Sequence, residues 1–232
     1  MSRLRAVFLY RDDTISRVSP VQAQAMYRAI GEIVGVPDFS ITNDDYTALF
    51  TRTMAVPGIA PVNTPEREEA FWLRWMQFIF EDHGLTEGAA ELSAEVRRRF
   101  VFHTMMEPFP ETREVLQALK DRGLKLGVIS DTYPSLKASL ESMGIAHYLD
   151  SIVASMVVGI SKPDPRIFEI ATNALGVKPQ ESVFVDDLQR NVDGARAAGM
   201  TAFRIDRSAA TDFSGGVIAS LRDLIAFADG AA

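Results

Sequence analysis

The chain has 232 residues and a net charge of -7, with 47 % hydrophobic and 24 % charged residues. This length suits one α/β core of about 140 residues plus an accessory domain, and the composition is that of an ordinary folded protein. The acidic balance argues against a nucleic-acid partner. The absence of cysteine excludes disulfides and thiolate chemistry and suits a reducing compartment, which we take to be the cytoplasm.

The first apolar run, Ala6 to Tyr10, is short, contains β-branched and aromatic residues and ends at a polar cluster that begins with Arg11. These features predict a strand that is buried on both faces of a sheet. The run is too short for the core of a signal peptide, and no later apolar run approaches the roughly 20 residues that span a bilayer. We therefore expect no membrane partner.

Residues 15–106 show helical periodicity and no comparable strand signal. Apolar residues recur at helical spacing in Val21–Val34, Asp44–Met54, Pro65–His83 and Leu92–Met105. The third of these segments is rich in aromatic residues around Met76, which favours core packing or a dimer contact. We therefore predict an all-helical cap domain over residues 15–106, and this cap could also mediate a homodimer.

From residue 107 onward, helical and strand patterns alternate. Helices are predicted at Glu111–Arg122, Pro134–Met143, Pro165–Leu175, Asn191–Ala198 and Gly216–Phe227, and strands at Leu124–Ile129, Ser151–Ser155, Ser182–Val185 and Thr201–Ile205. Repeated βα units predict a parallel sheet with helices on both faces. The predicted fold is therefore α/β, with a Rossmann-like core formed by residues 1–14 and 107–232 and the helical cap inserted after the first strand.

Polar residues follow several of the predicted strands. Asp12 follows the first strand, Ser130 the second, and Asp186 and Asp187 a later one, whereas Lys162 lies in the loop before the helix at Pro165. Ligands of open parallel sheets gather at the carboxyl ends of the strands, so these groups are expected to converge. Hydroxyl and ammonium groups suit a phosphate, and carboxylates suit a hard cation.

Four segments occur in a specific order: Tyr10-Arg11-Asp12-Asp13-Thr14, Ser130, Lys162-Pro163-Asp164-Pro165 and Asp186-Asp187. In this order they resemble the motifs of the haloacid dehalogenase superfamily. Its first motif is a strand followed by Asp-x-Asp-Gly-Thr, the second a strand ending in Ser or Thr, the third a Lys, commonly in Lys-Pro-x-Pro, and the fourth a strand ending in paired acids. The predicted cap lies where the family's first type of cap belongs.

This resemblance implies a role for each matching residue. Asp12 stands at the general-acid position, and Thr14, Ser130 and Lys162 stand at positions that bind phosphate. Asp186 stands at the metal-ligand position, with Asp187 and the backbone carbonyl of Asp12 as further ligands. The implied activity is phosphatase-type hydrolysis of a small phosphorylated metabolite with Mg²⁺ as the cofactor.

The first motif departs from the family pattern at two positions. Tyr10 occupies the position of the nucleophilic aspartate, and Asp13 occupies that of the glycine at the turn. Shifting the register to make Asp12 the nucleophile would place Thr14 at the acid position, so the ungapped alignment is preferred. A phenol with an ordinary pKa of about 10 replaces neither a nucleophile nor a metal ligand. We therefore expect very low phosphatase and dehalogenase activity and weakened Mg²⁺ binding.

Three functions remain open at this stage. The preferred function is binding of a phosphorylated small molecule without the usual chemistry. The first alternative is an active hydrolase with rearranged chemistry that uses Asp12, Asp13 or Asp187. The second is an interaction protein without a ligand. The polar residues at the strand ends argue against it, because buried charges without a ligand are unfavourable. In this family the cap usually sets substrate choice, and residues 15–106 contain no motif that identifies a substrate.

Overall fold

The computed structural model describes residues 3–230, and these residues divide into two compact units. The α/β unit comprises the chain up to Arg17, the segment Glu107–Thr132 and the chain from Leu136 onward, whereas the helical unit comprises Val18–Met106 and Tyr133–Ser135. The predicted domains, an α/β core of residues 1–14 and 107–232 and a helical cap of residues 15–106, stay a prediction. In the described range, no helix has the combined length and apolar character needed to cross a membrane.

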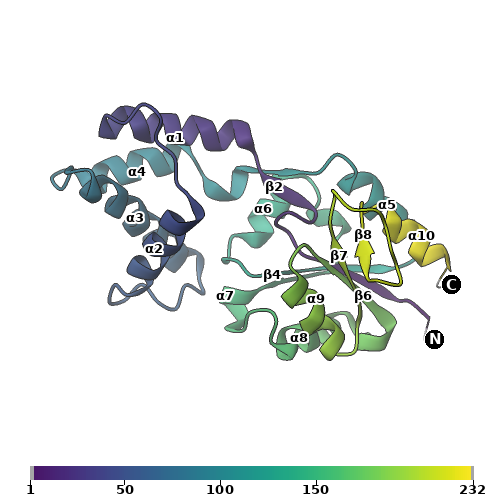
Figure 1. The fold of residues 1–232 in the computed structure, drawn as a ribbon. Helices are drawn as coiled ribbons and strands as arrows, with labels where there is room; N and C mark the ends of the chain where they lie inside the picture. The colour runs from purple at the N-terminus through teal and green to yellow at the C-terminus, as the bar shows by residue number, and fades with distance from the viewer. Residues whose placement is uncertain (1–2, 231–232) are drawn as a thin grey trace. The chain divides into compact units, whose positions relative to one another are not determined.

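The α/β unit is built on a parallel sheet with six strands in the described residues, in the order β5-β4-β1-β6-β7-β8 (Figure 1). The strands are β1 Ala6–Leu9, β4 Lys125–Ser130, β5 Ser151–Ala154, β6 Ser182–Asp186, β7 Thr201–Ile205 and β8 Val217–Ile218. The strand β1 is central, and every one of its residues is buried. Burial on both faces explains why its sequence is an uninterrupted apolar run.

Helices cover both faces of this sheet. They are α5 Thr112–Asp121, α6 Leu136–Ser142, α7 Ser155–Val158, α8 Pro165–Leu175, α9 Gln189–Ala197 and α10 Asp223–Gly230, with 3-10 turns at Ala146–Tyr148 and Pro179–Glu181. Figure 1 shows α8 and α9 on one side and α5 and α10 on the other. Phe8 of β1 belongs to the core cluster that includes Phe168 of α8, and Val7 and Leu9 face the opposite side because strand side chains alternate. The predicted fold class is therefore confirmed.

The C-terminal segment differs from its prediction. Gly216–Phe227 was expected to be one helix, but it contains β8, and α10 begins only at Asp223. The backbone N–H of Arg204 in β7 donates to the carbonyl of Gly216 at 2.9 Å. The segment therefore satisfies backbone groups at the edge of the sheet, and a strand of two residues is too short to leave a recognisable sequence pattern.

Two further short strands, β2 Ser16–Val18 and β3 Met106–Pro108, form a separate two-stranded sheet. They were not predicted, because three residues give too little periodicity. The guanidinium of Arg17 contacts the carboxylate of Glu107 at 2.9 Å across this pair. The pairing places the two ends of the segment between these strands side by side.

The helical unit contains α1 Pro20–Val34, α2 Asn43–Met54, α3 Pro65–Asp82 and α4 Ala89–Arg99, followed by a 3-10 turn at Phe102–Thr104. Two helices begin at threonine caps, because Thr42 accepts from the backbone of Asp45 and Thr64 from that of Arg67. The helix predicted over Leu92–Met105 ends early. Phe100 leaves the helical conformation with φ -126°, and its carbonyl accepts from Arg97.

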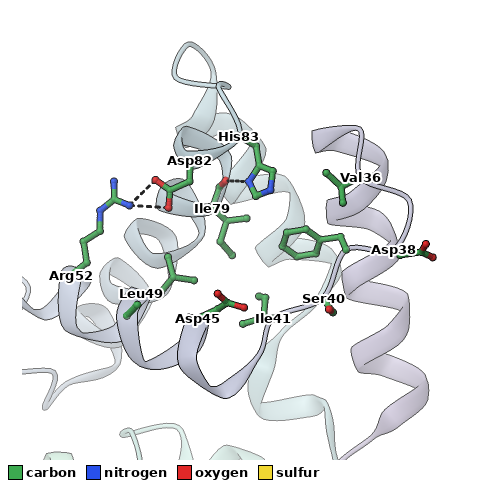
Figure 2. Close-up of a pocket in the computed structure, with 12 residues that line it drawn as sticks. Val36, Asp38, Ser40, Ile41, Asp45, Leu49, Arg52, Ile79, Asp82 and His83 are labelled. Carbon is green, nitrogen blue, oxygen red and sulfur yellow. Dashed lines mark hydrogen bonds and ion pairs between the residues drawn. The ribbon is translucent and has the colours of Figure 1, made fainter.

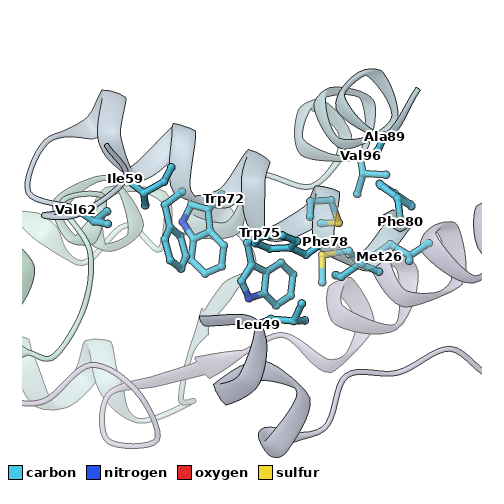
Figure 3. Packing of buried hydrophobic residues seen from close by; sticks show 14 of the residues in the cluster. Met26, Leu49, Ile59, Val62, Trp72, Trp75, Phe78, Phe80, Ala89 and Val96 are labelled. Atoms are coloured by element: carbon cyan, nitrogen blue, oxygen red, sulfur yellow. The ribbon is translucent and has the colours of Figure 1, made fainter. Parts of the chain in front are cut away.

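Aromatic rings fill the core of the helical unit (Figure 3). The ring of Trp72 lies 4.3 Å from that of Phe102 and 5.7 Å from that of Trp75, measured between centroids. Phe71 and Phe80 are fully buried in the same cluster. Their burial assigns these side chains to the core rather than to an exposed surface, and a homodimer through this unit stays a prediction.

Candidate active site

Three neighbouring strands of the α/β unit end at one edge of the sheet. The strand β1 lies between β4 and β6, and these two neighbours end at Ser130 and Asp186. Tyr10 follows β1, and its backbone N–H donates to the carbonyl of Val185 at 2.9 Å. The parallel order therefore brings Tyr10, Ser130 and Asp186 to the edge where ligands of such sheets bind.

Lys162 reaches this edge from the loop before α8. Its ammonium group donates to Oδ2 of Asp186 at 2.6 Å and to the carbonyl of Ile129 at 3.2 Å. Both side chains of the ion pair are 0 % exposed. Burial lowers the pKa of Lys162, and the carboxylate of Asp186 opposes that shift. The attraction between the ammonium and the carboxylate must offset the free-energy cost of removing both charges from water. The pair is thus a fixed part of the site.

The helix α9 fixes both members of this pair. A Cβ at Gly194 would lie 2.6 Å from the carbonyl oxygen of Pro163, so only glycine lets the helix approach the Lys162 loop this closely. In the first turn of the helix, the side-chain amide of Asn191 donates to the two carboxylate oxygens of Asp186 at 3.0 and 3.1 Å. The backbone N–H of Leu188 donates to the same carboxylate at 2.9 Å. Every oxygen of that carboxylate therefore already has donors.

Tyr10 packs beneath Lys162. The ammonium nitrogen of Lys162 lies 3.5 Å from the centroid of the Tyr10 ring, which is a cation–π contact. The phenol hydroxyl donates to Oδ2 of Asp12 at 3.2 Å. Burial, followed by the carboxylates of Asp12 and Asp186, raises the pKa of Tyr10 far above its ordinary value. Tyr10 is therefore a neutral phenol at neutral pH.

Arg11 holds the carboxylate of Asp12 from the other side. Its Nε donates to Oδ1 at 2.9 Å, and its Nη2 donates to Oδ2 at 3.0 Å. The same Nη2 donates to the hydroxyl of Thr132 at 3.1 Å. The side chain of Arg11 is only 12 % exposed. The carboxylate of Asp12, which the resemblance places at the general-acid position, is thus fixed by a bidentate ion pair and by the phenol of Tyr10.

The turn after β1 has a left-handed residue. Asp13 has φ 51°, the one positive φ of a non-glycine residue in the described part of the chain. Aspartate tolerates this conformation better than most residues, and the resemblance places a glycine here, so the geometry supports the ungapped alignment. Arg207 fastens the turn by donating to the carbonyls of Asp13 at 3.1 Å and Thr14 at 2.9 Å. Burial, followed by the nearby Asp12, raises the pKa of Asp13.

At this edge of the sheet, two buried hydroxyls have no hydrogen-bond partner among the described residues. They are Oγ of Ser130 and Oγ1 of Thr14, and both residues are fully buried. Most buried polar groups in folded proteins have a partner, so these two call for an explanation. A ligand with acceptor oxygens at this edge would satisfy both, because a hydroxyl can donate to such an oxygen.

Two further carboxylates lie at the edge. Burial, followed by the charge of Asp186, raises the pKa of Asp187 to about 6. Its Oδ1 is buried without a partner in the described range. Asp131 accepts from the backbone N–H of Lys162 at 2.9 Å, and burial raises its pKa as well. Asp187 is therefore the carboxylate in this set that is poised to exchange a proton near neutral pH.

These residues do not fit Mg²⁺, the ion that the resemblance implies. Mg²⁺ requires near-octahedral oxygen ligands that are free to bind it. The carboxylate of Asp186 is occupied by Lys162, Asn191 and the backbone of Leu188, and Tyr10 supplies a neutral phenol where the family has a carboxylate. Over residues 3–230, no three His, Cys, Asp or Glu side chains are grouped so as to hold a metal ion.

Sequence reasoning missed several contributors to this edge. Asn191 lies one helical turn after the paired acids, and this spacing could have indicated it. Arg11 lies inside the first motif, but its contact with Thr132 depends on the pairing of β1 with β4. Arg207 is separated from Asp13 by 194 residues, so no local signal could have found it.

A separate cavity lies within the helical unit (Figure 2). Its volume is about 510 Å³, and its lining comes from the segment after α1, from α2 and from the end of α3. Arg52 donates to both carboxylate oxygens of Asp82, at 2.7 and 2.9 Å. Nδ1 of His83 lies 2.7 Å from the carbonyl oxygen of Ile79, and the ring packs edge-on against Phe39. None of the predicted site residues lines this cavity.

Comparison with known proteins gives consistent matches over most of the chain. The profile of the family described as haloacid dehalogenase-like hydrolase matches residues 5–199. A protein of Mycobacterium tuberculosis named as a phosphatase is 29 % identical over 217 residues, covering 88 % of this chain and 99 % of that protein. Phosphoserine phosphatase of Thermus thermophilus is 30 % identical over 233 residues, covering 88 % of this chain and 89 % of that protein.

Solved structures show the same fold. The crystal structure of 2-haloacid dehalogenase from Pseudomonas syringae pv. Tomato has a TM-score of 0.72 at 22 % identity, covering 99 % of this chain and 100 % of that chain. At this level of identity the likeness concerns the fold and not the activity. The α/β sheet and the helical insertion therefore have solved counterparts.

Proposed function

The chain belongs to the haloacid dehalogenase-like hydrolases, and from this premise we propose that it binds a phosphorylated small molecule and has largely lost the family's aspartyl-phosphate chemistry. The observation that carries the proposal is Tyr10. It stands at the end of β1 where the resemblance places the nucleophile, and its hydroxyl is bonded to Asp12. The residues at the proposed phosphate-binding positions are thus present, but the position that the resemblance gives to the nucleophile carries no carboxylate.

The phenol of Tyr10 is a poor substitute for that carboxylate. A tyrosine nucleophile must lose its proton, and the buried, acidic surroundings of Tyr10 raise its pKa and oppose that loss. Removing the nucleophile from an enzyme of another class costs on the order of a millionfold in turnover. Conventional phosphatase and dehalogenase activity is therefore expected to be very low.

The phosphate-binding positions supply the second part of the proposal. The unpartnered hydroxyls of Ser130 and Thr14 are available to donate to phosphate oxygens, and Lys162 provides a fixed positive charge beside them. Relatives similar over most of the chain are named as phosphatases, and one acts on phosphoserine by its name. A small phosphorylated metabolite such as phosphoserine is therefore the ligand to test first.

A second candidate is a hydrolase with rearranged chemistry. It is favoured by Asp187, whose pKa is raised to about 6 and whose Oδ1 lacks a partner among the described residues. Asp187 would accept a proton from water while the water oxygen bonds to phosphorus. The bond from phosphorus to the ester oxygen breaks, and that oxygen leaves with the electron pair and takes up a proton from solvent to form the alcohol. If this candidate is right, the wild-type protein hydrolyses a phosphate ester and Asp187→Asn abolishes that activity.

The assay compares wild type with Tyr10→Asp and Tyr10→Phe in Mg²⁺-dependent hydrolysis of p-nitrophenyl phosphate and phosphoserine. Wild type and Tyr10→Phe are expected at the blank rate. Tyr10→Asp restores the missing carboxylate and is expected to gain activity, because a carboxylate there gives Lys162 a second partner and makes Asp186 available to Mg²⁺. Tyr10→Phe is the matched control, because it changes the same side chain without adding a carboxylate. Rapid turnover by wild type would overturn the loss of activity. Circular dichroism checks that all three proteins are folded.

Location and assembly complete the proposal. We propose a cytoplasmic protein that can form a homodimer through the helical unit. Light scattering coupled to size-exclusion chromatography tests the assembly directly, and a monomeric mass at all concentrations would contradict the dimer.

A further inference from the structure

The α/β site already contains two cationic side chains, those of Lys162 and Arg11. They lie where the family places a metal ion beside the phosphate group of the substrate. Lys162 neutralises Asp186, the carboxylate at the metal-ligand position, and does so from full burial at 2.6 Å. An incoming metal ion would have to displace this ammonium and the donors on Asn191 and Leu188. Displacement would strand a buried charge, which is costly.

Arg11 provides a second cation at the same edge. Its Nε and Nη2 are used in bonds to Asp12 and Thr132, which fix the plane of the guanidinium group. Its Nη1 has no hydrogen-bond partner among residues 3–230, although the side chain is only 12 % exposed. An oriented guanidinium with free N–H groups is well suited to phosphate oxygens.

We propose that this site binds the phosphate group of its ligand without Mg²⁺, and that Arg11 contacts the phosphate through Nη1 in place of a metal ion. This inference rests on the proposed binding function and adds to it the source of the positive charge. Arg11–Asp12 and Lys162–Asp186 are both ion pairs, so neither carboxylate presents an uncompensated charge to the ligand. The hydroxyls of Ser130 and Thr14 supply the remaining donors.

The test is isothermal titration calorimetry of phosphoserine and of inorganic phosphate, in EDTA and in excess Mg²⁺. Wild type is expected to bind equally well in both buffers. Arg11→Gln removes the guanidinium and is expected to weaken binding by on the order of tenfold to a hundredfold, as for loss of a charged hydrogen bond. Arg166→Gln is the matched control, because Arg166 also pairs with an aspartate close in sequence, Asp164, but is exposed.

Each outcome has a separate meaning. Absence of binding in both buffers overturns the proposed function itself. Binding that requires Mg²⁺ overturns this inference and leaves the proposed function standing. Binding in EDTA that is unchanged in Arg11→Gln overturns the role of Arg11.

Two further measurements keep the inference testable if Arg11→Gln fails to fold. Arg11→Lys keeps the charge but loses the planar fork, so weaker binding by a folded variant is expected, and unchanged binding contradicts the guanidinium contact. Titration of Mg²⁺ alone should give no saturable heat with wild type. Saturable binding of Mg²⁺ to wild type overturns the inference.

Discussion

Both units of the protein bury aromatic rings, but they differ in the charged groups that they bury. The α/β unit encloses an ion pair, Lys162 with Asp186, at the edge of its sheet, whereas the helical unit encloses rings such as Phe71 and Trp75. Rings in a core need no explanation beyond packing, but a buried ion pair must offset a large desolvation cost. Perturbed, buried charges therefore point to function, and they are concentrated at the sheet edge of the α/β unit.

The helical unit also contains buried charged residues, such as Glu68 and Arg97, but its ion pairs are at least partly exposed. The ion pair Arg52–Asp82 has side chains that are 44 % and 47 % exposed. Exposed pairs of this kind contribute only about 0–1 kcal/mol. The helical unit is thus expected to owe its stability to ring packing, and the α/β site to owe its geometry to charges.

The largest expected effect is the loss of stability when one ring is removed from the aromatic core of the helical unit. Phe71 is fully buried, with ring centroids of Phe50, Trp72 and Tyr133 at 5.6, 5.0 and 5.4 Å. Phe71→Ala leaves a cavity and should lower the free energy of unfolding by about 4 kcal/mol. Urea unfolding followed by tryptophan fluorescence measures this loss, because Trp72 and the second tryptophan, Trp75, both lie in the helical unit.

A control in the same unit is Val21→Ala. Val21 is 76 % exposed, so its truncation should change stability by less than about 0.5 kcal/mol. Equal losses in the two variants would contradict the assignment of stability to the rings. Circular dichroism of the same samples shows whether the two units unfold separately, because in that case Phe71→Ala leaves a second transition in place.

The next largest effect is the loss of stability when the buried ion pair between Lys162 and Asp186 is broken. Lys162→Met leaves Asp186 without its cation but with donors from Asn191 and Leu188, so the loss should be about 3 kcal/mol, at the low end for a broken buried pair. Urea unfolding measures it. Lys120→Met is the control, because the Lys120–Asp150 pair is about one third exposed and should contribute only about 0–1 kcal/mol.

A double variant sharpens this comparison. Lys162→Met with Asp186→Leu removes both charges, and stability should recover relative to the single variant because no uncompensated charge is left. A double variant as unstable as Lys162→Met would mean that the loss comes from packing rather than from charge. Similar losses in Lys162→Met and Lys120→Met would also contradict the comparison.

Much of the α/β unit could be predicted from sequence, and the reason is physical. A strand buried on both faces, such as Ala6–Leu9, must be apolar throughout, and strand ends that meet at one edge carry polar residues in a fixed order. The strand β8 escaped prediction because it has only two residues and lies at the edge of the sheet. Contacts such as Arg207 with the Asp13 turn depend on the completed fold, and no local pattern encodes them.

The helical unit was predictable only in outline. Its helices follow from apolar periodicity, but the end of α4 depends on Phe100 leaving the helix and on a side-chain contact from Arg97. Its cavity is assembled from three separate segments, none of which carries a motif. Ring packing is set by shape and not by residue order, so sequence reasoning could name the core residues but not the cavity beside them.

The smallest expected effect tests the titration of Asp187. The pKa of this carboxyl is about 6 in the folded protein against an ordinary value of 3.8, because burial and Asp186 disfavour its charge. The folded state therefore holds the proton more tightly than the unfolded chain, and the stabilisation that this gives is present below pH 4 and lost as the pH rises through 6. Asp187→Asn removes this dependence.

The stability of wild type relative to Asp187→Asn should therefore fall between pH 4 and pH 7, by about 1 kcal/mol once solvent screening of this half-buried group is allowed for. Urea unfolding of both proteins at several pH values measures the difference, and contributions from groups that do not interact with Asp187 cancel in it. A difference that stays flat or rises with pH would mean that Asp187 is as well solvated as a surface carboxylate. The buried charge of the site would then be confined to Lys162 and Asp186, and Asp187 could not serve as the proton acceptor of a rearranged hydrolase.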